Sequence, residues 1–127
     1  MENHIIQKRK DPRLNMITIT QPKAKTLVDK TIELAMIELT DDQKETLIDT
    51  LAKQPINTSA ETQEEKLEEI ASLIELIEDY VEKEGITVDN MERMEAVQYE
   101  GIPANETSAF YGSRYYAIED MLLQELY

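Results

Sequence analysis

The clearest helical pattern in the chain lies at residues 62–85, which read TQEEKLEEIASLIELIEDYVEKEG. Six apolar side chains recur there at steps of three and four residues: Leu67, Ile70, Ala71, Ile74, Ile77 and Val81. This period is typical of an amphipathic helix with one face in a core. Thr62-Gln63-Glu64-Glu65 matches a capping box, although Ser59 is an alternative N-cap, and Gly85 suits the residue after a helix end. A helix over about 61–84 is therefore predicted.

Two more helices are predicted on the N-terminal side of this stretch. From Lys23 to Leu39, apolar residues recur at helical spacing and predict a helix over about 23–39. Thr40-Asp41-Asp42-Gln43 then reads as a second capping box, so a new helix should start near Asp41. This helix should stop at Gln54-Pro55, because the residue before a proline disfavours the helical conformation.

Two further helices are predicted on the C-terminal side. Thr87-Val88-Asp89-Asn90 restarts a short helix that runs through Val97, and Gly101-Ile102-Pro103 ends it. Ser113 is placed to cap a last helix over residues 114–126. One capped helix after another, joined by short links, is typical of a helical bundle. We therefore expect an all-α fold, a small helical bundle of four to five helices.

The N-terminal region differs from the rest of the chain. Residues 1–15 are polar and interrupted by Pro12, and MITIT at residues 16–20 alternates like a strand but is too short to form a sheet alone. We therefore expect two parts, a flexible basic N-terminal arm over residues 1–22 and an acidic helical domain over residues 23–127.

The chain is strongly acidic, with a formal net charge of −14. Residues 1–30 carry a balance of +4, whereas residues 31–127 carry −18. A body of this charge repels nucleic acid and anionic membranes at long range and attracts basic partners. We therefore expect no direct nucleic-acid or membrane binding, and a partner that is a larger protein with a basic or hydrophobic docking site. An acidic surface that is only solvated is the alternative.

Conventional catalytic groups are missing from the sequence. The chain has no Cys, its single His4 has no companion ligand, and it has no glycine-flanked nucleophile or glycine-rich phosphate loop. No apolar run approaches the roughly 18 residues of a membrane span, and no signal core follows the basic N-terminal residues. We expect a cytoplasmic protein that is not an enzyme and has neither cofactor nor metal.

Carboxylates of residues 62–85 gather on one side of the predicted helix. At about 100° per residue, five of them share a sector of about 60°: Glu64, Glu68, Glu75, Asp79 and Glu82. Such residues bind Mg²⁺ when a second helix supplies more carboxylates, and the neighbouring predicted helices lack a second set. The sector is therefore interpreted as a solvated face or as a surface for a basic partner.

The same region resembles two families. Glu68-Glu69-Ile70-Ala71-Ser72, followed by Leu73–Gly85 and Ile86-Thr87, resembles the second metal-binding helix of the all-α nucleotide pyrophosphatases, the MazG-like group. Leu27-Val28-Asp29-Lys30 is similar to the opening stretch of that family. The family has an aspartate where this chain has Ser72, and paired glutamates where it has Leu51-Ala52-Lys53. The resemblance therefore implies a degenerate relative without metal-dependent hydrolysis.

The second resemblance is to the small late-transcription coactivators of T4-like phages. Residues 77–86, IEDYVEKEGI, resemble their helix–turn segment, and the acidic-apolar stretch from Glu119 to Tyr127 resembles their polymerase-binding tail. This resemblance implies a phage-encoded regulator that binds a larger protein assembly.

Aromatic and apolar residues near the C-terminus are a second candidate surface. Phe110, Tyr111, Tyr115 and Tyr116 either cover one end of the core or serve as binding anchors.

The predicted last helix is apolar on more than one side. Met121, Leu123 and Tyr127 cannot all face the same core as Ile118 and Leu122. Surplus apolar surface favours self-association or insertion into a partner's groove, so Met121, Leu123 and Tyr127 are the candidate anchors.

Three functions remain open from the sequence. The first is a non-enzymatic protein-binding regulator or adaptor that acts through an acidic helical surface, with a phage-encoded inhibitor or a nucleic-acid mimic as special cases. The second is a small structural or assembly protein of a virion or complex, in which the basic arm links neighbouring subunits and the chain forms a homo-oligomer. The third is a degenerate MazG-like protein.

Overall fold

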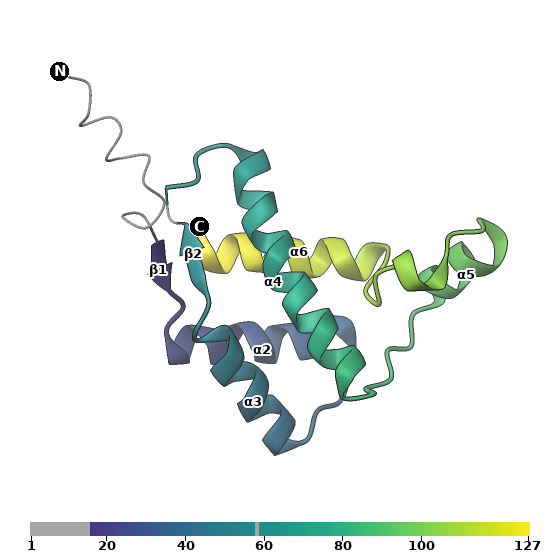
Figure 1. The fold of residues 1–127 in the computed structure, drawn as a ribbon, viewed down its shortest axis with the longest axis horizontal. Helices are drawn as coiled ribbons and strands as arrows, with labels where there is room; N and C mark the ends of the chain where they lie inside the picture. Colours follow the sequence, from purple (N-terminus) through teal and green to yellow (C-terminus); the bar gives the residue numbers. More distant parts are fainter. Residues whose placement is uncertain (1–15, 58) are drawn as a thin grey trace.

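The computed structural model describes residues 16–57 and 59–127, and it is mostly helical (Figure 1). The elements in chain order are β1 (Met16–Thr18), α2 (Gln21–Ala35), α3 (Asp41–Leu51), β2 (Pro55–Asn57), α4 (Gln63–Lys83), α5 (Met91–Tyr99), the 3-10 turn η2 (Ala104–Glu106) and α6 (Ser113–Leu126). The predicted all-α class and the predicted number of helices are confirmed. Residues 1–15, to which most of the expected flexible arm belongs, lie outside the described residues.

The two capping boxes and the glycine after α4 are where the sequence placed them. The Thr40 hydroxyl accepts a hydrogen bond from the Gln43 amide at 3.1 Å, and the Gln43 side chain accepts from the Thr40 amide at 3.0 Å. Thr62 and Glu65 form the same reciprocal pair, so Thr62 rather than Ser59 caps α4. Gly85 has a φ of +66° just after α4, which confirms its expected place.

The helix predicted over 23–39 begins and ends earlier. Thr20 is its N-cap and Pro22 lies in its first turn, where a fixed φ and a missing N–H are tolerated. The helix ends at Ala35, because Met36 adopts a left-handed conformation with a φ of 56°. Gln21 and Pro22, which the predicted arm included, are therefore the first two residues of this helix.

The start of the chain also differs from expectation. β1 pairs antiparallel with β2, with Ile17 opposite Ile56, and the Ile19 amide donates to the Gln54 carbonyl at 3.1 Å. Ile19 and Ile56 are buried beneath this ribbon. Residues 16–22 therefore belong to the folded domain and not to the arm. The partner strand β2 lies in the polar connection between α3 and α4, so the sequence gives no sign of a strand that could pair with β1.

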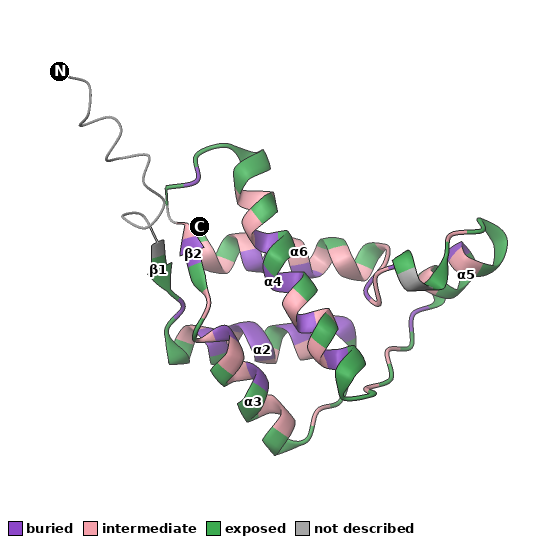
Figure 2. Ribbon diagram, viewed as in Figure 1, coloured by how far each residue is buried: buried purple, intermediate pink, exposed green. Residues whose placement is uncertain are grey.

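The core lies between α2, α4 and α6, with α3 beside α2 and α4. Figure 2 shows buried residues on the facing sides of these helices. Ile74 and Ile77 are fully buried in the middle of α4, as the stripe predicted. The stripe is rotated relative to the prediction, because Leu73 is buried whereas Ala71 is exposed. α4 contacts both α3 and α6, so its apolar face follows these neighbours.

Helix α5 projects from the end of the bundle (Figure 1). It begins after Asn90 rather than at Thr87, and the buried Asn90 side chain donates to the carbonyls of Ala109 (3.1 Å) and Tyr111 (2.9 Å). Helix α6 begins at Ser113 itself, with Gly112 as N-cap, so the predicted Ser113 cap was wrong. Residues 87–112 thus form a segment that Asn90 holds together internally, and Phe110 packs it into the core of the bundle.

Candidate functional site

The acidic sector of α4 is a surface feature. All five of its predicted members, Glu64, Glu68, Glu75, Asp79 and Glu82, are exposed. No salt bridge joins any of them to another residue in the described part of the chain. Their negative charge is therefore directed to solvent or to a partner.

The C-terminal half of the sector lines a concave surface. Glu75, Asp79 and Glu82 line a shallow groove of about 300 Å³ whose other wall includes Glu106 and Arg93. Glu64 and Glu68 lie farther towards the start of α4 and do not line it. The structure thus divides the predicted set. Glu75, Asp79 and Glu82 are the members that share a groove with Arg93 of α5 and with residues 106–109.

Glu78 on α4 binds the segment of residues 106–109, which forms the other wall of the groove. Its carboxylate accepts hydrogen bonds from the Ser108 hydroxyl and from the Ala109 amide (2.8 Å). Arg93 holds the other side of the loop, because its guanidinium donates to the Ala104 carbonyl at 3.2 Å and lies 3.5 Å from that of Thr107. The groove therefore has walls that are fixed by charge-assisted hydrogen bonds.

A larger pocket of about 570 Å³ continues from this groove, since Glu106 and Ser108 line both. It lies between α5, η2 and the start of α6. We call it the tyrosine–glutamate pocket, because its lining residues include three tyrosines and four glutamates: Tyr111, Tyr115, Tyr116, Glu92, Glu95, Glu100 and Glu106. No basic residue is among the described side chains that line it.

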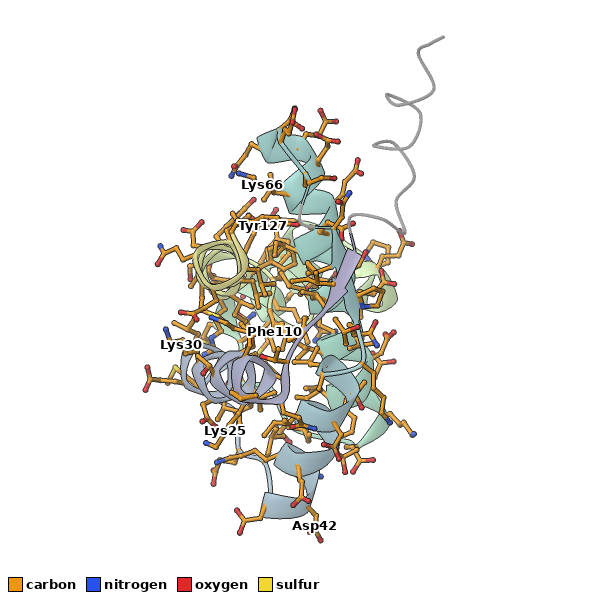
Figure 3. The ribbon with its side chains drawn as sticks, turned by 90° about the vertical axis from the view of Figure 1, so that its left-hand side faces the viewer. Lys25, Lys30, Asp42, Lys66, Phe110 and Tyr127 are labelled. Atoms are coloured by element: carbon orange, nitrogen blue, oxygen red, sulfur yellow. The ribbon has the colours of Figure 1, made fainter. Side chains whose placement is uncertain are left out.

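The aromatic cluster around Gly112 turns out to have two roles. Phe110 is fully buried and lies well inside the mass of side chains (Figure 3). The tyrosines line the pocket, and the rings of Tyr115 and Tyr116 meet edge to face, 6.0 Å apart and at 85°. Core cover and binding anchor were the two alternatives. Phe110 lies in the core and Tyr115 is partly buried against it, whereas the second alternative stays open for Tyr111 and Tyr116.

The glutamates of the pocket were missed by the sequence analysis. Glu92 and Glu95 are three residues apart and so share one side of α5, which is a signal that the sequence does contain. Glu100 and Glu106 are in turns, and no periodicity relates them to α5. Only the folding back of residues 100–112 brings these carboxylates to one pocket.

Glu92 also caps helix α6. Its carboxylate accepts from the Ser113 hydroxyl and from the Ser113 amide at 3.2 Å. These two hydrogen bonds lower the pKa of Glu92 from its usual 4.5. A carboxylate at a helix N-terminus is also favoured by the helix dipole. Glu92 thus takes the place of the predicted Ser113 cap.

The stability that Glu92 provides is expected to depend on pH. Because its pKa is lowered in the folded state, the stabilisation is present above about pH 4.5 and is lost as pH falls through the lowered value. Thermal melts of wild type and Glu92→Gln should therefore differ at neutral pH and converge in acid. In a Ser113→Ala background the same substitution should have a smaller effect. A pH-independent difference between the two proteins would contradict this assignment.

The predicted anchors on the terminal helix are largely used within the fold. Met121 is buried, at 9% exposure, and Leu123 is half-buried against the core. The Tyr127 hydroxyl donates to the Asn57 carbonyl at 3.0 Å, and its ring lies 5.4 Å from Lys66 Nζ (Figure 3). The expectation of surplus apolar surface is therefore wrong for Met121, because α6 packs against both α2 and α4, whereas Tyr127 remains 39% exposed.

Exposed apolar side chains instead gather on α5. Met91, Met94 and Tyr99 are 68%, 56% and 75% exposed. We call these three residues the α5 apolar patch. The sequence does not reveal this patch, because a nine-residue helix without an apolar stripe gives little indication of which face is buried.

The described residues have neither a cluster suited to a metal ion nor a helix suited to a membrane. In residues 16–57 and 59–127, no three Asp, Glu or His side chains are grouped so that they could hold a metal ion. Within the same ranges, every helix is too short or too polar to cross a bilayer. Glu68, which carries the pyrophosphatase resemblance, lies on the exposed side of α4. No protein family, no curated protein and no solved structure matches this chain significantly.

Proposed function

We propose that this protein is a non-enzymatic regulator or adaptor that binds a basic surface of a larger protein. The observation that supports this best is the continuity of the acidic surface. Glu75, Asp79 and Glu82 on α4 share a groove with Glu106, and Glu106 also lines the tyrosine–glutamate pocket. Arg93 is the single basic residue along these walls in the described part of the chain. A positively charged partner surface is complementary to it.

Electrostatic attraction alone would give a weak complex. Exposed ion pairs contribute only about 0–1 kcal/mol each, so affinity requires buried apolar contacts. In this proposal the α5 apolar patch supplies these contacts, in place of the predicted anchors Met121, Leu123 and Tyr127. Methionine side chains adapt to irregular surfaces and are common at binding sites.

Charge reversal in the groove tests the proposal. We expect Glu75→Lys combined with Glu82→Lys to reduce association with a captured partner by about 10-fold or more at low salt, because the attraction that steers the encounter is lost. Partners are captured from a lysate with wild-type bait, and association and dissociation rates are then measured for each variant by surface plasmon resonance. The salt dependence of association should weaken as well.

The matched control reverses two exposed glutamates away from the groove. Glu33→Lys combined with Glu38→Lys changes the net charge by the same amount, and neither residue lines the groove or the pocket. Equal losses in both double variants would mean that only net charge matters. A partner that binds the groove variant as tightly as wild type would overturn the proposal.

A second arm of the same experiment concerns the α5 apolar patch. Met91→Ser combined with Met94→Ser should mainly speed dissociation, because apolar anchors are buried only after docking. Truncation after Asp120 is unsuitable for this purpose, since it would remove the fully buried Leu122 from the core.

A further inference from the structure

The tyrosine–glutamate pocket has unpaired negative charge as well as volume. Glu92 is engaged by Ser113, but no hydrogen bond or salt bridge to another described residue involves the carboxylates of Glu95, Glu100 and Glu106. These three groups belong to α5, the turn after it and η2, so they approach the pocket from different directions. A cation in the pocket would therefore be attracted from more than one side.

The aromatic walls define which kind of cation fits. Tyr115 and Tyr116 line the pocket with rings that are nearly perpendicular, and Tyr111 adds a third ring. Tyrosine faces attract cations and also pack against flat apolar surface. Metal ions need several oxygen ligands close together, whereas a large organic cation spans dispersed carboxylates and rings. The described carboxylates here are not grouped for a metal.

We infer that the tyrosine–glutamate pocket binds the side chain of an arginine presented by a basic segment of the partner protein. This inference rests on the proposed function, in which the partner is basic. Arginine is favoured over lysine because its planar guanidinium stacks on aromatic rings and donates two parallel hydrogen bonds to a carboxylate. Tyr115 and Tyr116 supply the rings, and Glu106 supplies a carboxylate where the pocket meets the α4 groove.

The test uses the intact protein and short peptide probes. The probes are capped pentapeptides with a central arginine, lysine or citrulline between glycines, where citrulline keeps the shape of arginine without its charge. Binding is followed by NMR, on the amides of Gly112 and Ser113 and on the tyrosine rings. We expect the arginine peptide to bind about tenfold more tightly than the citrulline peptide, with lysine in between.

Two sets of variants locate the binding. Glu95→Gln combined with Glu106→Gln should weaken the arginine peptide about tenfold, and Tyr116→Ala should weaken it several-fold. All three side chains are exposed, so the fold should persist, which circular dichroism verifies. Glu33→Gln combined with Glu38→Gln is the control with the same charge change outside the pocket and should bind as wild type does.

Several outcomes would overturn the inference. Equal binding of the arginine and citrulline peptides, shifts confined to residues outside the pocket, or insensitivity to the pocket substitutions would each do so. Stronger shifts of the same signals by Mg²⁺, with displacement of the peptide, would make the pocket a metal site instead. Failure of the peptide to bind leaves the proposed function standing if groove charge reversal still slows association. Peptide binding without any effect of charge reversal contradicts the proposed function alone.

Discussion

Phe110→Ala is expected to lower the free energy of unfolding by about 3–5 kcal/mol. Phe110 has no exposed surface and is the only phenylalanine in the chain. Its removal leaves a large cavity beside helices that cannot move together without losing their other contacts. Chemical denaturation followed by circular dichroism measures the loss. The same side chain anchors the loop that carries Ser108 and Tyr111, so the pocket should lose its order first.

Tyr116→Ala is the control for this substitution. It removes an aromatic ring of similar size from a position that is 64% exposed, so the expected loss is below about 0.5 kcal/mol. If both variants were destabilised equally, Phe110 would not be packed as described.

Gly112→Ala is expected to have the second large effect. Gly112 has a φ of +89° and a ψ of −142°, a conformation that residues with a Cβ adopt only at about 1–3 kcal/mol. An added Cβ would also lie 2.7 Å from Glu92 Cδ and would displace the carboxylate that caps α6. Loss of this cap adds to the backbone cost, so a thermal or chemical melt should show a larger loss than the backbone conformation alone would cause.

Gly101→Ala separates the two contributions. Gly101 has a φ of +71°, and an added Cβ there would meet nothing within 4 Å. Only the backbone term applies, at about 1–2 kcal/mol. A loss at Gly112 no larger than the loss at Gly101 would show that Glu92 moves aside freely and that its cap adds little.

What the sequence predicted well was local. The capping boxes at Thr40 and Thr62 place both partners of each hydrogen bond within three residues, so no tertiary information is needed. The stripe around Ile74 and Ile77 also follows from one helix alone. Gly85 is a further local case, since a left-handed residue after a helix favours glycine whatever surrounds it.

What the sequence did not predict depends on pairing between distant segments. β1 is recognisable only with β2, which lies about 40 residues later and contains a proline. The sequence predicts Met121 outside the core stripe, because a single amphipathic helix buries one stripe against one neighbour, whereas α6 packs against both α2 and α4. The glutamates of the pocket come together through turns rather than through helical periodicity, so residue spacing did not reveal them.

The position of α6 between α2 and α4 affects how the chain folds during its synthesis on the ribosome. Synthesis proceeds from the N-terminus, so α2 and α4 emerge well before residues 113–126. Until Ile118 and Leu122 arrive, the apolar faces that they cover remain open to water and to other nascent chains. The bundle therefore cannot fold cooperatively until α6 has been synthesised. Before then, the exposed apolar faces of α2 and α4 are available for a chaperone to bind.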